Sequence, residues 1–450
     1  MTRVGDIMNQ SDVNERRTAI HLLRSGRTPS EVAEELQRSL AWVYKWRKRF
    51  FEHENWDDLQ DRSRAPKHCP NKLPEEVRQA ICQARSELEV EATEPGKLCY
   101  IGAPAVRTRL RKKQAQRLPS ITSIERELRA AGMTGPRQPA QPAQITYPHL
   151  QALGAQQLLQ VDIVTHYLRG GPCVACFNAI DVVSRYPTGQ QFSSRRSLDA
   201  LDFLIQVWQE LGIPQFTQVD NESCFSGGFT HPGVLGKVLR LALFVGTELV
   251  FSPVRHPESN GWVERFHQDY NQHVWDKFEL PNLDAVRSHS PDFFEAYRHS
   301  EHHSALAGRS PAQIHFVTPA LHLPADFRPS KRLPLTAGRV HFMRRVNQDT
   351  RISLLNLDWE VPTAQPDQGV WATLEFCHHH AKLRVYDTAP DASKRTCLAV
   401  HPFPIKEPVQ PLRTEFQKPI PVELSPLSLA TNLFRSMLHK RIPVWISTML

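Results

Sequence analysis

Three acidic residues stand on or at the end of expected regular elements. In mid-strand a charge is costly unless it is paired or binds a cation, whereas a glutamate on a helix, taken alone, is usually solvated at the surface. Asp162 lies in the middle of the β-rich run 158–164, and Asp220 closes a second short strand. Glu264 borders the apolar stripe of a helix that should begin at the turn 259–261. Carboxylate oxygens suit Mg²⁺ and Mn²⁺, and clustered carboxylates repel one another unless a cation lies between them. These residues, which we call the carboxylate triad, predict a two-metal phosphoryl-transfer site.

Three further carboxylates lie close enough in the sequence to compete with the triad. Asp181 ends the next expected strand, where an ion pair with Arg185 would give it a structural role. Glu222 falls in the loop beyond its strand, and Glu258 precedes the expected helix. Residues on rigid elements are held more firmly than residues on loops, so we assign both metal binding and catalysis to the triad.

The triad and its surroundings resemble the DDE catalytic core of retroviral integrases and bacterial insertion-sequence transposases. The resemblance rests on the order of the three carboxylates and on the helix-opening sequence HPESNGWVERFH at 256–267. The run 179–186 is similar to the second core strand of that family, and the run 297–312 is similar to the segment that closes the core. The similarity covers about residues 151–319. Two features depart from it. Glu222 stands where the family usually has glycine, and 43 residues separate Asp220 from Glu264, more than is usual in the family.

The resemblance implies a fold, a cofactor and a substrate. The fold would be an RNase H-like α/β catalytic core, with Mg²⁺ or Mn²⁺ held by the triad. The activity would be cleavage and strand transfer of double-stranded DNA, at the element ends and in the target. The enzyme would act as a homo-oligomer assembled on DNA.

The elements expected around the triad agree with such a core. An antiparallel meander is followed by helices that alternate with strands, which is an α/β pattern. The expected strands are 158–164, 174–180, 189–192, a short strand ending at Asp220, and 247–251, with helices at 197–211 and 234–243.

The first fifty residues predict a helix-turn-helix DNA-binding domain. Thr28-Pro29-Ser30-Glu31 is a strong helix start after Gly26, and a basic helix follows near residue 40. Val43 and Trp46 can pack inward, which leaves the basic side chains outside as candidate DNA contacts. Those candidates are Lys45, Arg47, Lys48 and Arg49. A plain three-helix bundle with a solvated basic face remains the alternative.

A second helical unit and its linker also carry basic residues. Arg62 and Arg64 lie in a short proline-broken linker that could reach phosphates or a minor groove. Arg107 and Arg109 belong to the second unit, which ends with a serine-led helix near 120–128. We count these four arginines as candidate DNA contacts. Asn260, on the polar edge that runs beside Glu264, completes the set.

The chain therefore reads as a multidomain α/β protein with all-α units in front. We expect the helix-turn-helix domain at 1–65, the second helical unit at 66–135, a linker at 136–150 and the catalytic core at 151–320. Short β-rich runs at 330–405 predict a small β-barrel. A C-terminal tail at 406–450 follows, with a short basic helix expected at 429–441.

Composition agrees with a polyanionic partner. The chain has 450 residues, and 55 Lys and Arg against 47 Asp and Glu give a net charge of +8. The basic residues crowd the first 140 positions, while no apolar run is long enough to span a bilayer. The eight cysteines are scattered, which is typical of a reducing compartment. We expect a DNA-associated protein of the bacterial cytoplasm, with no membrane partner.

Two other functions stay open on the sequence alone. A transposase-derived protein that has lost catalysis would keep the DNA-binding units and show no response to metal. An RNase H-type nuclease acting on RNA–DNA hybrids would have the same core fold, but it would not need two N-terminal DNA readers.

Overall fold

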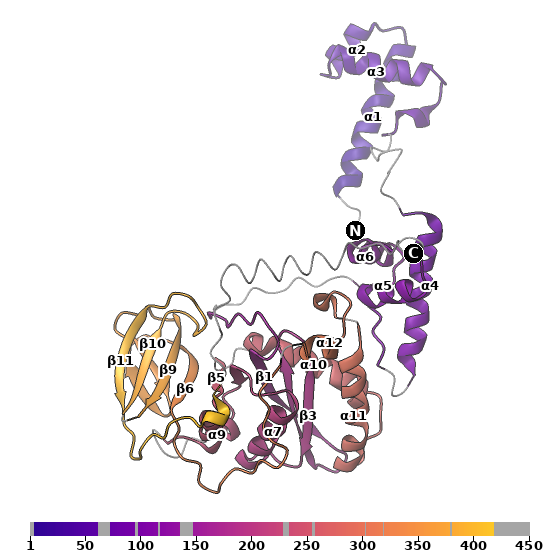
Figure 1. The fold of residues 1–450 in the computed structure, drawn as a ribbon. Helices are drawn as coiled ribbons and strands as arrows, with labels where there is room; N and C mark the ends of the chain where they lie inside the picture. The colour runs from indigo at the N-terminus through magenta and orange to yellow at the C-terminus, as the bar shows by residue number, and fades with distance from the viewer. Residues whose placement is uncertain are drawn as a thin grey trace, which may run out of the picture. The chain divides into compact units, whose positions relative to one another are not determined.

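The computed structural model describes residues 4–61, 73–94, 98–115, 118–135, 147–227, 234–253, 257–301, 303–317, 319–378 and 380–417. Their contacts divide the chain into two compact units, Met1–Pro74 and Glu75–Leu450 (Figure 1). Each unit has a hydrophobic core of its own. The expected helix at 429–441 and most of the 136–150 linker lie outside the described residues.

The first unit consists of short helices around an aromatic core. Its elements are α1 (Val4–Arg24), α2 (Pro29–Glu35), α3 (Leu40–Phe51) and the 3-10 turn η1 (Trp56–Leu59). Thr28 and Glu31 form a capping box at the start of α2, as the sequence predicted. Ile20, Trp46 and Phe50 pack together with Leu59 in the centre. The expected helix-turn-helix arrangement is therefore present.

The second unit begins with three further helices. They are α4 (Glu75–Thr93), α5 (Ala103–Lys112) and α6 (Ile121–Ala130). Ser120 caps α6 by accepting a hydrogen bond from the amide of Ser123, which confirms the serine-led start. Ile81, Val106 and Ile124 are fully buried and hold the three helices together.

A mixed β-sheet carries the rest of the unit. Its first five strands are β1 (Leu158–Tyr167), β2 (Cys173–Asp181), β3 (Pro187–Phe192), β4 (Phe216–Val219) and β5 (Glu248–Phe251). β1, β2 and β3 form the expected antiparallel meander, while β4 pairs in parallel with both β1 and β5. This order and these directions agree with the RNase H-like core predicted from the sequence.

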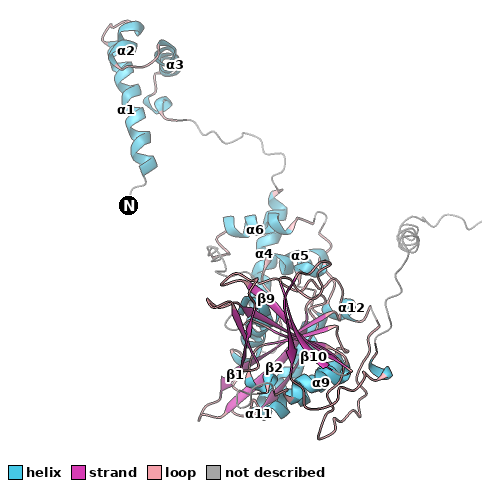
Figure 2. Ribbon diagram, turned by 90° about the vertical axis from the view of Figure 1, so that its left-hand side faces the viewer, coloured by secondary structure: helices cyan, strands magenta, loops and turns pink. Residues whose placement is uncertain are grey.

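Helices cover both faces of the sheet (Figure 2). One face packs against α7 (Ser197–Glu210) and α9 (Lys237–Val245), and the short helix α8 (Ser223–Ser226) lies beside them. The other face packs against α10 (Gly261–Tyr270), which continues as a π-helical turn to Trp275, and against α11 (Leu283–His299). Successive residues of a strand point to opposite faces, so β2 sends Phe177 to the first layer and Cys176 to the second.

The C-terminal strands extend the same sheet. β6 (Gly338–Arg345) pairs in parallel with β5, and β9 (Gly369–Cys377), β10 (His380–Tyr386) and β11 (Cys397–Phe403) follow outward. Within the described residues the result is one nine-stranded sheet, from which the hairpin of β7 (Arg351–Leu354) and β8 (Leu357–Glu360) stands apart. The expectation of a separate small barrel is not confirmed. The sequence predicted that residues 330–405 form strands, but the alternation of apolar residues does not show which strands pair with one another.

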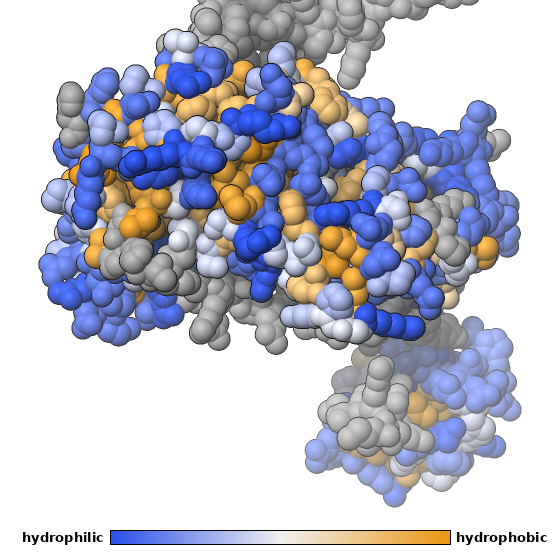
Figure 3. All heavy atoms as spheres, turned by 90° about the horizontal axis from the view of Figure 1, so that it is seen from below, coloured by the Kyte–Doolittle hydropathy of each residue, from blue (hydrophilic) through white to orange (hydrophobic). Residues whose placement is uncertain are grey.

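On the face drawn in Figure 3, hydrophilic side chains surround patches of apolar ones. None of their helices is long and apolar enough to cross a membrane. The cysteines among them are free thiols.

Candidate active site

Strand β1 directs Asp162 toward helix α10. Its neighbours Val161 and Ile163 belong to the core layer beneath α7 and α9. The alternation of a strand therefore turns Gln160 and Asp162 to the opposite face. Gln160 contacts the start of α10, and the Asp162 carboxylate lies 3.7 Å from the Nδ1 atom of His267 on the same helix. Asp162 is thus an acid placed between a sheet and a helix.

Asp220 lies beside Asp162 because their strands are adjacent and parallel. The register pairs Gln160 of β1 with Gln218 of β4. Each aspartate follows its glutamine by two residues, so the two carboxylates occupy equivalent positions on neighbouring strands. Asp220 comes directly after the last residue of β4 and accepts a hydrogen bond from the amide of Glu222 at 3.0 Å. The site thus forms where β4 ends.

Two glutamines, Gln160 and Gln218, hold the start of the helix that carries Glu264, and we call this pair the glutamine clamp. The Oε1 atom of Gln160 accepts hydrogen bonds from the amides of Trp262 at 3.1 Å and Val263 at 3.3 Å. These amides belong to the first turn of α10, whose N–H groups have no partner within the helix. The Nε2 atom of Gln160 donates to the Ser259 carbonyl at 3.0 Å. One side chain from the Asp162 strand therefore fixes the helix that carries Glu264.

Gln218 forms the second half of the glutamine clamp. Its Nε2 atom donates to the Ser259 carbonyl at 2.8 Å, to Asn260 Oδ1 at 2.7 Å and to Ser252 Oγ at 3.1 Å. Ser252 also donates to Asn260 Oδ1 at 2.7 Å. Asn260 is 5% exposed and fully engaged inside the protein. Its predicted role as a DNA contact is therefore not supported. The buried amide positions the helix instead.

The electrostatics show that the triad carboxylates interact. Burial, followed by the charge of Asp220 and then that of Glu264, raises the pKa of Asp162 to about 7. Burial likewise raises the pKa of Asp220 to about 6 and raises that of Glu264. Burial lowers the pKa of His267 to about 4, so this ring is neutral near pH 7 and does not compensate the aspartates. The charge of Arg195 lowers the pKa of Asp220, but burial outweighs it.

The donor set fits a hard divalent cation in its chemistry. All three triad residues supply carboxylate oxygens, the ligands that Mg²⁺ and Mn²⁺ prefer. Burial and neighbouring negative charges raise the pKa values of Asp162 and Asp220, and a bound cation would stabilise their ionised forms. As they stand, the three do not form a compact ligand group. Across the described stretches, no set of three His, Cys, Asp or Glu residues is close enough to hold a metal ion.

Glu222 brings a fourth carboxylate to the site. Its Oε1 atom lies 3.1 Å from Arg195 Nη1, and its charge contributes to the raised pKa of both Asp162 and Asp220. The sequence placed this residue in a loop away from the triad. The structure makes it the N-cap residue of α8, where it acts on the triad electrostatically.

Replacing Glu222 by glutamine should move the acid limb of metal-dependent activity to lower pH. Removing its negative charge lowers the pKa of Asp162 and Asp220, so both carboxylates ionise in more acidic solution. Cleavage rates measured between about pH 5 and pH 8 would show the shift, and measurable strand transfer should remain. Abolished cleavage at every pH would instead identify Glu222 as a ligand in place of Glu264.

The other two competing carboxylates have different outcomes. Asp181 is fully buried and accepts hydrogen bonds from the amides of Gln156, Val183 and Ser184 and from the Ser184 hydroxyl. This supports a structural role, although the expected ion pair with Arg185 is absent from the described contacts. The backbone of Glu258 lies in a 3-10 turn, and its side chain is outside what the structure describes.

Helix α3 presents the predicted basic face. Lys45, Arg47 and Lys48 are exposed, while Val43 and Trp46 are buried as expected. Arg49 is partly engaged, because its Nη2 atom donates to the Gln60 carbonyl at 2.8 Å. Arg47 and Lys48 also line an open hollow of about 470 Å³ together with the aromatic side chains of Tyr44 and Phe51. A basic helix face with exposed aromatic rings suits a polynucleotide.

Replacing both Arg47 and Lys48 by glutamine should weaken duplex DNA binding by the whole protein. Each lost phosphate contact should reduce the slope of log K against log salt by about 0.9. Fluorescence anisotropy at several salt concentrations would measure this. The matched control replaces Arg17 and Arg24, exposed arginines of α1, in the same way. Equal losses of DNA affinity in both double variants would contradict DNA binding by the basic face of α3.

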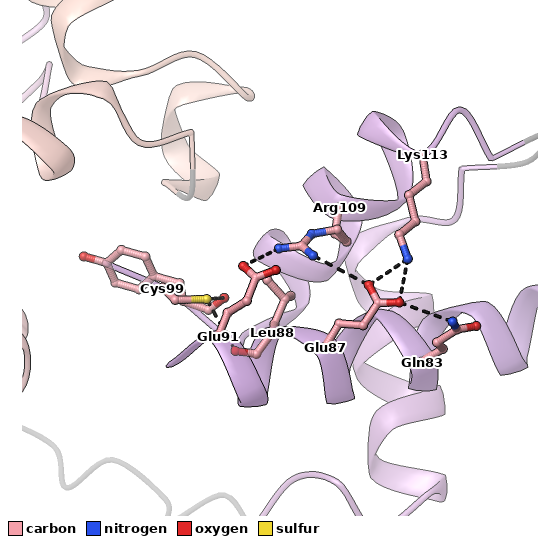
Figure 4. A network of polar contacts seen from close by, with 8 residues as sticks. Gln83, Glu87, Leu88, Glu91, Cys99, Arg109 and Lys113 are labelled. Atoms are coloured by element: carbon pink, nitrogen blue, oxygen red, sulfur yellow. Dashed lines mark hydrogen bonds and ion pairs between the residues drawn. The ribbon is translucent and has the colours of Figure 1, made fainter. Parts of the chain in front are cut away.

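Both candidate arginines of the second helical unit bind other parts of the protein, and Figure 4 shows the contacts of Arg109. Arg109 lies 2.6 Å from Glu91 and 3.6 Å from Glu87, and the Glu91 hydrogen bond raises its pKa. Arg107 donates to the Pro119 carbonyl at 3.0 Å. These contacts argue against a direct phosphate role for either side chain. Arg62 and Arg64 lie outside the described residues, so their DNA contacts stay predictions.

Sequence reasoning missed the glutamine clamp and His267. Gln160 and Gln218 each stand two residues before a triad aspartate, which places them on the same strand face. This shared spacing was the available signal. Buried polar side chains next to a predicted site are expected to have hydrogen-bond partners.

Comparisons with known proteins agree with this arrangement. Residues 16–79 match the family described as winged helix-turn helix, and residues 245–311, which include Glu264, match the integrase core domain family. Solved structures similar to the chain include the HTLV-2 integrase catalytic core domain in complex with magnesium. Its identity is 16%, with 37% of this chain and 99% of that chain covered and a TM-score of 0.29.

Two further structures are similar at the same level. The simian T-cell lymphotropic virus intasome, solved with a PP2A regulatory subunit, is 15% identical, covers 70% of this chain and 96% of its own, and has a TM-score of 0.32. The catalytic core domain of BIV integrase is 17% identical, with 36% and 94% covered and a TM-score of 0.28. The chain therefore carries a region similar to a winged helix-turn helix ahead of a region similar to an integrase core domain.

Proposed function

We propose that this protein is a DNA transposase of the DDE type, which binds element ends and catalyses metal-dependent strand cleavage and strand transfer. The observation that supports it most is the placement of Asp162 and Asp220 at equivalent positions of two adjacent parallel strands, where burial and the charges of Asp220 and Glu264 all raise the pKa of Asp162. Coupled, partly buried carboxylates with raised pKa values are typical of a catalytic centre. The helix-turn-helix unit supplies a means of binding duplex DNA.

The triad residues would hold Mg²⁺ or Mn²⁺, which when bound neutralises charge on the scissile phosphodiester and activates the attacking hydroxyl. The chain itself fixes the geometry. Strands β1 and β4 keep the two aspartates at one level, and the glutamine clamp holds Glu264 opposite them. Transfer from one oxygen to another needs no protein nucleophile.

The same proposal gives the remaining parts their roles. Residues 1–65 and 66–135 would bind the element ends, and 151–320 would carry out catalysis. The C-terminal strands would support the catalytic sheet, because Arg344 of β6 donates to Asn221 Oδ1, beside Asp220, at 3.0 Å. Because one such site acts on one strand, a homo-oligomer on DNA would act on both ends. Such a protein would work beside DNA in the bacterial cytoplasm.

The test is cleavage and joining of duplex DNA that carries the inverted repeats flanking the gene. Activity should appear with Mg²⁺ or Mn²⁺ and disappear in EDTA, whereas DNA binding through the first unit should persist in EDTA. Full activity in EDTA would contradict the proposal. Binding without cleavage under any metal would favour a catalytically inactive DNA-binding protein. Cleavage of RNA–DNA hybrid alone would favour a nuclease.

A further inference from the structure

A cavity on the far side of helix α10 from the triad is lined by two arginines, Arg185 and Arg265. It measures about 390 Å³ and lies between the segment 99–105 and the core. Trp262, Arg265 and Asp269 line it from α10, at helical spacings of three and four residues that place them on one face. Arg185, from the turn after β2, completes the wall on that side. The cavity and the triad therefore share a helix and use different faces of it.

Arg185 is an unusual arginine within this cavity. It is 9% exposed, and its guanidinium lies 3.2 Å from the centre of the Trp262 ring. Its Nη1 atom is buried and has no hydrogen-bond partner among the described residues. Its backbone has φ of 62°, in the left-handed region that a long side chain rarely adopts. A buried charge without a hydrogen bond is costly, so this arrangement calls for a partner that is absent here.

The remaining charges leave the cavity positive. Arg265 is compensated by Asp269, at 3.3 Å. Burial and then the charges of Arg185 and Arg265 lower the pKa of His303 to about 4, which makes that ring neutral near pH 7. Arg185 feels the charge of Asp181, but among the described residues it has no carboxylate within ion-pair distance. A planar guanidinium held against an indole ring is well suited to two parallel hydrogen bonds to a phosphate.

We propose that this cavity binds a phosphodiester of the DNA strand, with Arg185 as its anion ligand and the exposed part of the Trp262 side chain available to an adjoining base. The inference rests on the proposed function and adds a subsite to it. Trp262 is 44% exposed, and aromatic side chains beside a cationic groove are a usual platform for unpaired bases. Trp262 and Arg265 belong to the helix that carries Glu264, so a strand bound in this cavity contacts another face of the same helix.

The experiment measures DNA binding by the full chain in EDTA, which separates it from catalysis. The probe is a fluorescent duplex with a single-stranded overhang, titrated between about 50 and 200 mM KCl. Arg185→Gln should bind several-fold more weakly and lose about 0.7 to 0.9 from the salt slope, the value of one phosphate contact. Arg328→Gln is the matched control, because that arginine is exposed and donates to the Phe327 carbonyl. The control should keep the wild-type slope.

A second variant keeps the test decisive should Arg185→Gln fail to fold. Arg265→Gln removes a side chain that is 63% exposed, so folding should survive, and it should lower the salt slope in the same direction. Identical slopes for wild type, Arg265→Gln and any folded Arg185 variant would overturn the proposal. The proposal would also be overturned if inorganic phosphate raised the melting temperature of the wild type while Arg185→Gln bound DNA as the wild type does. The ligand of the cavity would then be a free anion. If the wild type did not cleave DNA with any metal, that result would count against the proposed function and not against this binding site.

Discussion

Replacing Asp162 by asparagine should abolish DNA cleavage and, at the same time, make the metal-free protein more stable at pH 8. Loss of one metal-binding carboxylate should lower the rate by at least about 10³-fold. The stability gain follows from linkage. The pKa of Asp162 is raised to about 7 in the folded chain, above its ordinary 3.8, so the folded state binds more protons between these values. Stability of the metal-free protein therefore falls as pH rises from about 4 to 7.

The size of this effect has an upper bound. A difference of about three pKa units corresponds to roughly 4 kcal/mol, and the Asp162 side chain is 20% exposed, so the true value is smaller. Thermal unfolding at pH 5 and pH 8, with and without Mg²⁺, would measure it. Mg²⁺ should stabilise the wild type and leave Asp162→Asn nearly unchanged.

Two matched variants show whether the effect belongs to the site. Asp202→Asn alters an exposed aspartate of α7 and should change neither stability nor cleavage. Asp181→Asn should lower stability by about 3 kcal/mol or more, because Asp181 accepts several buried hydrogen bonds that an amide cannot all accept. Destabilisation of the metal-free protein by Asp162→Asn at pH 8 would contradict the electrostatic account.

Replacing Gln218 by methionine should reduce the maximal cleavage rate about 100-fold while leaving DNA affinity nearly intact. The volume is conserved, but the donor that holds Ser259 and Asn260 is lost, so α10 and Glu264 shift relative to the aspartates. A residue that orients metal ligands typically changes metal affinity by 10 to 100-fold. The Mg²⁺ concentration for half-maximal activity should therefore rise, and excess Mg²⁺ should restore part of the rate.

The control for this variant is Gln206→Met. Gln206 donates to Glu210 on the surface of α7, so its replacement removes a glutamine of the same size without touching α10. It should keep both the wild-type rate and the wild-type metal dependence. If Gln218→Met showed a lower rate with unchanged metal dependence, the clamp would be a structural feature without influence on the site.

The sequence predicted the elements better than their connections. Strands of the core were placed within a few residues because alternation and turn residues are local signals. Asp162 and Asp220 could be singled out as candidates because carboxylates in apolar strands are rare and costly. The glutamine clamp could not, since the pairing of Gln160 with Gln218 depends on the register of two strands that are far apart in the chain. The engagement of Arg109 was hidden for the same reason, because Glu87 and Glu91 lie on another helix.

The junction between β5 and β6 has a consequence for how the chain is made. Leu249 pairs with Val340, and Phe251 stacks on Phe342 with ring centres 4.8 Å apart. During synthesis from the N-terminus, one edge of β5 has no partner strand until roughly ninety more residues, up to β6, have been added. An unpaired strand edge can pair with another chain. The nascent protein therefore has a window in which aggregation competes with completion of the sheet, and the window closes only when β6 leaves the ribosome.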